Sequence, residues 1–209
     1  MTTEPANSHH LEFYFDCSSP WTYLGFERAL QLFDESTVII EWKPILVGGL
    51  FNTINPSVYH TRENPVPAKE TYQAKDLQDW ANFVGIKIGR PSFHPVNSVK
   101  AMRGAFYALE ENCLVEYARL VFAAYWGDLL DISQDSVLED IVNQTPLSRE
   151  TFFEKINSAP YKQKLRDNVD ELSNRGGYGS PTMFLDGDDM YFGNDRFELI
   201  QAKIKSTKN

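Results

Sequence analysis

Hydrophobic residues near the start of the chain change their spacing at a short polar segment. Residues 11–15 form a largely apolar and aromatic run that predicts a buried strand. The polar residues 16–19 end this run, and apolar residues at helical spacing then predict a helix over residues 20–34. Residues 38–43 are mostly apolar and β-branched and predict a second strand. A strand, a helix and a strand with short links form a βαβ unit, which is normally parallel and right-handed.

The rest of the chain alternates between one long irregular segment and helical patterns. Residues 44–68 are rich in Gly, Pro and Asn and predict a long loop, and loops of this length tend to be functional. Apolar residues at helical spacing then predict helices over residues 69–84, 98–112, 115–126, 133–142, 148–157 and 161–176. Strands at 181–185 and 190–192 form a predicted hairpin, and a helix at 197–204 follows.

This order of elements predicts an α/β fold with a small mixed sheet and an all-helical domain inserted into it. The first part of the sheet domain is expected at residues 11–68 and its second part at residues 177–209. The helical insertion is expected between them, at residues 69–176.

Composition and charge narrow the classes of function. The chain has 209 residues, of which 42% are hydrophobic and 13% aromatic, as in a globular protein with a large core. A net charge of -9 argues against a nucleic-acid partner but not against a small anionic ligand. No window has the roughly 18 apolar residues of a membrane span. The first ten residues lack the basic start and apolar run of a secretory signal, so a cytoplasmic protein is expected.

Neither cysteines nor histidines form a metal-binding pattern. The two cysteines lie far apart, without a CxxC motif, and are expected to be reduced: Cys17 and Cys113. The four histidines have no HxxxH or HExxH spacing: His9, His10, His60 and His94. No metal site is therefore predicted.

The junction between the first strand and the first helix is the clearest candidate for chemistry. Ser19 precedes Pro20, which suits the first helical position because its missing N–H would be unpaired there anyway. The free N–H groups and the macrodipole at such a helix start favour an anion or a thiolate. The alternative is that Ser19 serves only as an N-cap.

Several local motifs together resemble a known family. Ser19-Pro20-Trp21-Thr22 stands where thioredoxin-fold oxidoreductases carry Cys-Pro-x-Cys, and Ser180-Pro181 stands where that fold places an x-Pro turn, usually cis. The other matches are FYFDCSSPWTYLG, KPILVGGLF, VPAKETYQAKDLQDWA, GSPTMFLDG and FGNDRF. From about residue 11 to residue 204, the chain resembles 2-hydroxychromene-2-carboxylate isomerases and the related kappa-class glutathione transferases. The resemblance implies a thioredoxin-like fold with a large helical insertion, and glutathione as cofactor.

The residues at the motif agree with chemistry that does not change the redox state. With Ser19 and Thr22 in the two cysteine positions, the site cannot cycle between dithiol and disulfide. The family's catalytic serine corresponds to Ser19, whose hydroxyl would hydrogen-bond the glutathione thiolate and lower its pKa. Ser18 is the nearest competitor for this role. Cys17 is expected to be a small buried hydrophobic residue.

The resemblance also implies further contacts with glutathione. Lys69 would pair with a glutathione carboxylate, and Ser180, before Pro181, would hold the cysteinyl part through its backbone. Asn194 and Asp195 would bind the γ-glutamyl end. An asparagine after the Gly-Gly turn also binds glutathione in the family. Because the loop departs here from the usual pattern, two residues compete for that role: Asn55, which is preferred, and Asn64.

A second substrate is expected between the helix start and the helical insertion. Lys43 ends the second strand and could meet a substrate carboxylate. Residues predicted to line an aromatic pocket are Trp21 and Tyr72, with Phe51, Trp80 and Arg103 as further candidates.

The implied reaction is a glutathione-dependent isomerisation in aromatic degradation. The thiolate adds to an unsaturated carbon of the aromatic acid, the new single bond rotates, and elimination returns the thiol. A kappa-like transferase and a non-catalytic thioredoxin-like binding protein stay open as alternatives. A homodimer is expected from the resemblance.

Overall fold

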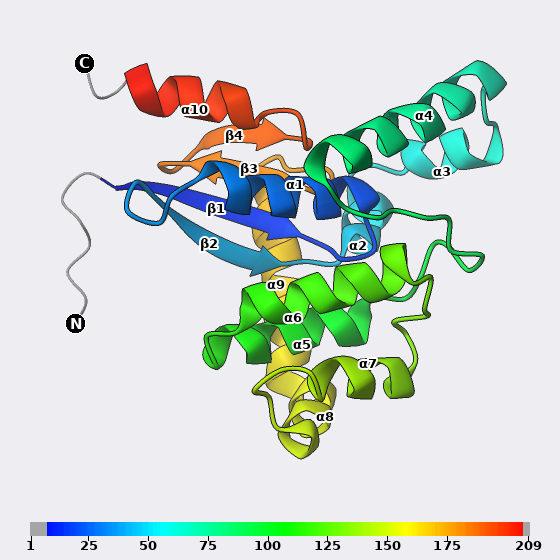
Figure 1. The fold of residues 1–209 in the computed structure, drawn as a ribbon, viewed down its shortest axis with the longest axis vertical. Coiled ribbons are helices and arrows are strands. Elements are labelled where there is room, and N and C mark those ends of the chain that lie inside the picture. The colour runs from blue at the N-terminus through cyan, green and yellow to red at the C-terminus, as the bar shows by residue number, and fades with distance from the viewer. Residues whose placement is uncertain (1–7, 207–209) are drawn as a thin grey trace.

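The computed structural model describes residues 8–206, which are built around a four-stranded mixed sheet (Figure 1). The strands are β1 (His9–Phe15), β2 (Val38–Pro44), β3 (Thr182–Leu185) and β4 (Asp189–Phe192), in the order β2-β1-β3-β4. β1 pairs parallel to β2 and antiparallel to β3, and β3 pairs antiparallel to β4. The predicted βαβ unit and the closing hairpin are therefore both confirmed.

Ten α-helices and one π-helical turn surround the sheet in the described part of the chain. They are α1 (Pro20–Leu32), α2 (Val47–Thr53), α3 (Ser57–Glu63), α4 (Pro67–Val84), α5 (Val99–Glu110), α6 (Leu114–Phe122), η1 (Ala123–Gly127), α7 (Asp135–Val142), α8 (Arg149–Asn157), α9 (Ala159–Asn174) and α10 (Phe197–Ser206). α1 and α10 cover one face of the sheet and α9 the other, while α5–α8 lie beyond the β2 edge (Figure 1). None of these helices is both long and apolar enough to cross a lipid bilayer.

The side chains of β1 alternate between two apolar clusters, as the pleat of a central strand requires. Phe13 and Phe15 belong to the larger cluster, which extends through α1 into the helical bundle. Tyr14 points to the other face and packs with Leu172 of α9 and Phe184 of β3. Burial on both faces explains why the first strand reads as a nearly continuous apolar run.

The prediction of a loop over residues 44–68 is wrong, because α2 and α3 lie within it. Each helix has only seven residues, too few for a hydrophobic period to be visible in the sequence. α2 begins where the Val47 N–H donates to the Asp16 carboxylate, 2.8 Å away. α3 has no buried residue at all. Tertiary contacts, not local apolar spacing, therefore define this segment.

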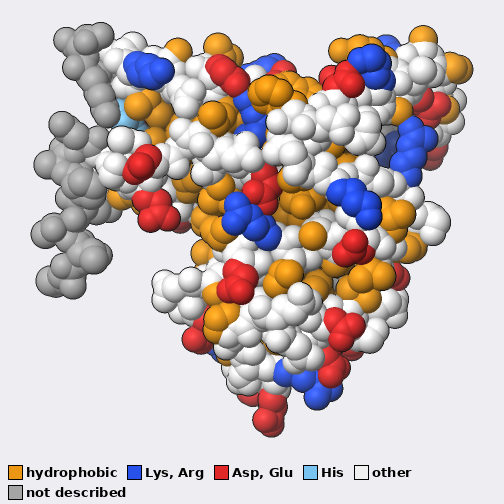
Figure 2. Space-filling view, viewed as in Figure 1, with side chains coloured by type: hydrophobic (Ala, Val, Ile, Leu, Met, Phe, Trp, Pro, Cys, Tyr) orange, Lys and Arg blue, Asp and Glu red, His pale blue; other side chains and the backbone are white. Residues whose placement is uncertain are grey.

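α3 and the first two-thirds of α4 form a helical arm that projects from the body (Figure 1). Of the eighteen residues of α4, only Ala81 and Val84 are buried, both near its C-terminal end. Hydrophobic side chains gather on the arm at the upper right of Figure 2, while acidic and basic side chains are interspersed over the described part of that face. The arm is therefore joined to the protein mainly through the end of α4, which packs on α1.

A cluster around Glu110 joins three helices of the bundle and predicts a dependence of stability on pH. Its carboxylate accepts hydrogen bonds from Lys155 and Lys164, each at 2.6 Å, and from the Tyr161 hydroxyl. Burial works to raise the pKa of Glu110, but these hydrogen bonds outweigh it and lower the pKa to about 2. Because the folded-state pKa lies below the ordinary 4.5, this stabilisation is complete above pH 4.5 and is lost as the pH falls towards 2.

Replacing Glu110 with glutamine should therefore flatten the acid limb of the stability curve. We expect the free energy of unfolding to fall by ~0.5–1 kcal/mol at neutral pH, a small value because the carboxylate is partly exposed. The difference from the wild type should shrink as the pH falls from 4.5 through about 2. Urea denaturation at several pH values measures it, with Glu150→Gln on exposed α8 surface as the control. A difference that stays constant with pH would contradict this assignment.

Candidate active site

Three hydroxyl groups meet between the start of α1 and the turn that leads into β3. The Ser19 hydroxyl accepts the Thr22 N–H at 3.2 Å and donates to the Ser180 carbonyl oxygen at 3.3 Å. The Thr22 and Ser180 hydroxyls lie 2.7 Å apart, and the peptide bond between Ser180 and Pro181 is cis. Ser19 is thus the N-cap of α1, and the same hydroxyl faces the proline turn. The two sequence interpretations of Ser19 are compatible.

A fully buried carboxylate holds the loop that carries Ser19. Asp16 accepts the Ser18 N–H at 2.9 Å with one oxygen and the Val47 N–H at 2.8 Å with the other. Its own N–H donates to the Ser180 hydroxyl at 3.2 Å. Burial raises the pKa of Asp16, against the effect of these N–H donors. Asp16 therefore joins the end of β1, the start of α2 and the proline turn into one rigid unit.

The loop before α10 lies against the same proline turn. The Gly193 N–H donates to the Pro181 carbonyl oxygen at 3.1 Å, with Gly193 at a positive φ of 105°. The side-chain nitrogen of Asn194 is buried and has no hydrogen-bond partner among the described residues. The neighbouring Asp195 carboxylate is half exposed and pairs with Arg196 at 2.6 Å. This loop thus offers an unused amide donor and a carboxylate close to the hydroxyl cluster.

A buried arginine that sequence reasoning missed positions this loop. The Arg28 guanidinium donates to the Asn194 carbonyl oxygen and pairs with Glu198. It also lies over two rings, 4.8 Å from the Trp80 centroid and 5.2 Å from that of Phe197. The available signal was a charged residue within the apolar stretch of the first helix. Trp80 therefore packs on Arg28 and helps to position the loop before α10.

A cavity of about 910 Å³ opens beside the start of α1. Its walls come from α1, from one side of α4 and from the segment that follows α4, and include Trp21, Glu70, Gln73, Leu77, Ile88 and Arg90. Trp21 lies on the wall of this cavity, and its contact with a substrate stays a prediction. Tyr72 is 63% exposed and is not among the residues of the wall.

The sequence model of the DsbA-like thioredoxin domain matches residues 10–205, almost the whole chain. The chain belongs to the DsbA-like thioredoxin family. It is similar to the 2-hydroxychromene-2-carboxylate isomerase of Pseudomonas putida, at 27% identity over 197 residues that cover 93% of each chain. It is also similar to glutathione S-transferase kappa 2 of Caenorhabditis elegans, at 28% identity over 222 residues that cover 93% of this chain and 91% of the relative.

The solved structure of a 2-hydroxychromene-2-carboxylate isomerase superposes on this DsbA-like chain with a TM-score of 0.80. The identity between the two is 26%, and 95% of each chain is covered. The resemblance inferred from sequence motifs is therefore confirmed, and so is the predicted thioredoxin-like fold with a helical insertion.

The structure brings one of the two competing asparagines to the proline turn of this DsbA-like protein. The Asn55 side chain donates to the Tyr178 carbonyl oxygen at 3.2 Å, two residues before Ser180. Asn64 instead lies at the end of α3 and donates to the His60 carbonyl oxygen of the same helix. The geometry thus agrees with the preference for Asn55, whose contact with glutathione stays a prediction.

Lys43 does not lie with the hydroxyl cluster. Its ammonium group lies 2.8 Å from Glu41, 3.6 Å from Glu171 of α9 and 3.8 Å from Glu12, on the α9 face of the sheet. Burial works to lower the pKa of Lys43, but the hydrogen bond and charge of Glu41 and the other two carboxylates hold it above its ordinary value. Lys43 is thus held among three protein carboxylates on the face of the sheet opposite α1, and its contact with a substrate carboxylate stays a prediction.

The remaining candidate residues lie in different parts of the structure. Lys69 is exposed in the first turn of α4 and has no carboxylate partner within residues 8–206. Phe51 lies in α2 beneath the Arg62 guanidinium, 5.6 Å from ring centroid to guanidinium carbon. Arg103 donates to the Ile156 carbonyl oxygen inside the helical bundle, so it does not reach the cavity wall.

Both cysteines are buried free thiols. Burial raises the pKa of the Cys17 thiol well above its ordinary value, so it is an unreactive, small apolar group, as predicted. Its carbonyl oxygen accepts the Trp126 indole N–H at 3.0 Å, which fixes the bundle against the Ser19 loop.

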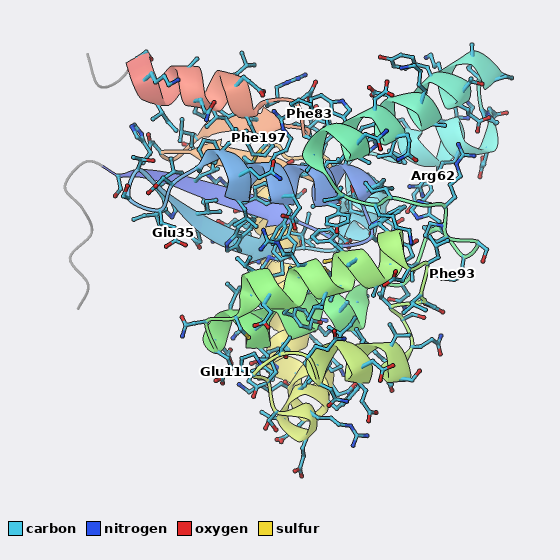
Figure 3. All side chains as sticks on the ribbon, viewed as in Figure 1. Glu35, Arg62, Phe83, Phe93, Glu111 and Phe197 are labelled. Atoms are coloured by element: carbon cyan, nitrogen blue, oxygen red, sulfur yellow. The ribbon has the colours of Figure 1, made fainter. Side chains whose placement is uncertain are left out.

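Arg62 on α3 reaches down towards the loop that carries Phe93 (Figure 3). In that loop, His94 lies 2.8 Å from the Tyr125 hydroxyl through its Nδ1. Burial and the charge of Arg62 together hold the pKa of His94 below its ordinary value. Neither residue was predicted, because the sequence gives no sign that residues 62 and 94 lie close together.

Proposed function

We propose that this DsbA-like protein binds glutathione and isomerises 2-hydroxychromene-2-carboxylate or a related unsaturated aromatic acid. The observation that carries the proposal is the cluster of Ser19, Thr22 and Ser180 hydroxyls at the start of α1. No cysteine lies in the two redox positions, so the helix start is suited to stabilise a thiolate that another molecule supplies. The relatives named as 2-hydroxychromene-2-carboxylate isomerases support the choice of reaction.

The residues around the cluster fit a glutathione molecule. The unpaired Asn194 amide nitrogen, buried beside the proline turn, is a donor suited to the γ-glutamyl carboxylate, and Asp195 is an acceptor suited to its amino group. Lys69, in the first turn of α4, has no carboxylate partner within the described residues and is suited to the carboxylate at the other end of glutathione. Glutathione, when bound, supplies a thiolate that adds reversibly to an unsaturated carbon and allows rotation about the former double bond.

The protein's part in this chemistry is to hold the glutathione thiolate in place and to stabilise its negative charge. The Ser19 hydroxyl donates to the Ser180 carbonyl oxygen at 3.3 Å, a long hydrogen bond that is easily redirected towards a thiolate. The first N–H groups of α1 add the positive end of the helix dipole. The rigid Asp16 network keeps the Ser19 loop in place while the hydroxyl changes its partner.

A second candidate function is a kappa-like glutathione transferase, which the 28% identical nematode relative favours. The two reactions share the thiolate site and differ in whether the product keeps the glutathione. Purified protein should be incubated with glutathione and 2-hydroxychromene-2-carboxylate, the products separated by chromatography, the isomers distinguished by their absorbance spectra, and any conjugate identified by its mass. The isomer trans-o-hydroxybenzylidenepyruvate with unchanged glutathione supports the isomerase, and a stable conjugate supports the transferase. Absence of glutathione binding at millimolar concentration would leave a non-catalytic binding protein.

A further inference from the structure

The cavity beside Trp21 is close enough to the hydroxyl cluster to hold a second substrate. Trp21 follows Ser19 by two residues, so their Cα atoms can be at most about 7.6 Å apart, given about 3.8 Å between consecutive Cα atoms. The volume of the cavity, about 910 Å³, lies within the range of roughly 300–1,000 Å³ usual for small-molecule sites. Trp21, Leu77 and Ile88 supply apolar wall, and α4 supplies polar wall that includes Gln73 and one carboxylate, Glu70.

One wall of the cavity is a short segment that the protein holds firmly. Ile88 is buried, and the Gly89 N–H donates to the Trp126 carbonyl oxygen at 2.7 Å. A Cβ at Gly89 would lie 2.8 Å from a methyl carbon of Leu129, so the backbone packs closely there. A buried proline follows at position 91 and restricts the backbone of the residue before it. Arg90 lies between these two anchors, so its side chain extends from a backbone position that is held firmly.

The guanidinium of Arg90 has no charged partner in the part of the chain that the structure describes. Arg90 is the sole cationic residue among those described as lining the cavity. Its guanidinium has no ion pair or hydrogen bond within residues 8–206, whereas Arg28, Arg119 and Arg175 each pair with a glutamate. In a chain with a net charge of -9, an unpaired guanidinium at a cavity wall is a specific feature.

We propose that Arg90 binds the carboxylate of the second substrate, with its apolar part against Trp21 and Leu77. A guanidinium presents two parallel N–H donors that match the two oxygens of a carboxylate. This inference rests on the proposed function, and it gives Arg90 the role that the sequence suggested for Lys43, which lies 2.8–3.8 Å from three glutamates. Arg90 then determines that the enzyme prefers acids over their neutral esters.

The test compares an acid with its methyl ester. Arg90→Met should raise KM for 2-hydroxychromene-2-carboxylate by about 10- to 100-fold, the usual effect of losing a charge-assisted pair. The kcat, the KM for glutathione and the turnover of the methyl ester should stay within about twofold, and Arg90→Lys should restore part of the loss. The matched control is Lys87→Met, since Lys87 is 77% exposed on the same segment and is not part of the wall.

Equilibrium binding separates this inference from the proposed function. The acid is titrated into wild type, Arg90→Met and Lys87→Met by calorimetry, with glutathione present, whether or not turnover occurs. Weaker binding in Arg90→Met alone supports the assignment even if the reaction is not an isomerisation. Equal binding to all three proteins, or no binding to the wild type, overturns it. A wild type that binds glutathione and acid but converts neither acid nor ester contradicts the proposed function alone.

Discussion

Replacing Ser19 with alanine should lower kcat/KM by about 100- to 1,000-fold, the usual effect of removing one donor from a site that stabilises an anion. The Ser19 hydroxyl, at the N-cap of α1, is the donor that faces the proline turn, at 3.3 Å from the Ser180 carbonyl oxygen. Without it, the thiol of bound glutathione should have a pKa closer to about 8.5, the ordinary value for a cysteine thiol. Thiolate absorbance in the ultraviolet, followed against pH with glutathione bound, measures that change directly.

The controls must separate the loss of the donor from the loss of the helix cap. Ser19→Ala also removes the acceptor of the Thr22 N–H, which costs about 1 kcal/mol of stability. Ser19→Thr keeps a hydroxyl in both roles and should retain most of the activity. Ser18→Ala should change kcat/KM by less than about threefold, since it is Ser19 and not Ser18 that hydrogen-bonds to the turn. A larger loss in Ser18→Ala than in Ser19→Ala would transfer the role to Ser18.

The largest effect on stability should come from a substitution that normally stabilises helices. Gly104 lies in α5, where an added Cβ would come within 2.4 Å of a ring carbon of Phe152 and of the Tyr117 hydroxyl. Both rings are fully buried, and the Tyr117 hydroxyl donates to the Ala101 carbonyl oxygen at 2.9 Å. Gly104→Ala should therefore lower the free energy of unfolding by about 2–4 kcal/mol, from overpacking and a broken hydrogen bond.

Gly48 is the matched control within the same protein. It lies in α2, and a Cβ there would meet nothing within 4 Å. Gly48→Ala should raise the free energy of unfolding by about 0.4–1 kcal/mol, because alanine restricts the unfolded chain without strain in the helix. Urea denaturation of the two variants and the wild type measures both changes. A Gly104→Ala protein as stable as the wild type would contradict the tight contact between α5, α6 and α8.

Helices and strands that bury an apolar face were predictable from the sequence. β1 is apolar because both its faces pack, and α5 carries regular spacing because it lies in the bundle. The loop prediction over residues 44–68 failed because the helices there bury almost no apolar face. α2 buries only Leu50 and α3 buries nothing, so their residues leave no periodic pattern. α2 instead begins at a hydrogen bond to Asp16, thirty-one residues earlier in the chain.

In the candidate site, too, some features were predictable from the sequence and others depended on the tertiary structure. The sequence by itself determined the two serine–proline motifs of the site. Ser19 precedes the proline that starts α1, and Ser180 precedes the proline of the cis turn. Both serve local backbone geometry, which neighbouring residues dictate. Only the tertiary structure decided which charges are free. Lys43 is ion-paired with glutamates from three segments, while Arg90, on a cavity wall, has no ion pair within residues 8–206. The pairing of a charge depends on chain segments that meet only after folding, and no local pattern encodes it.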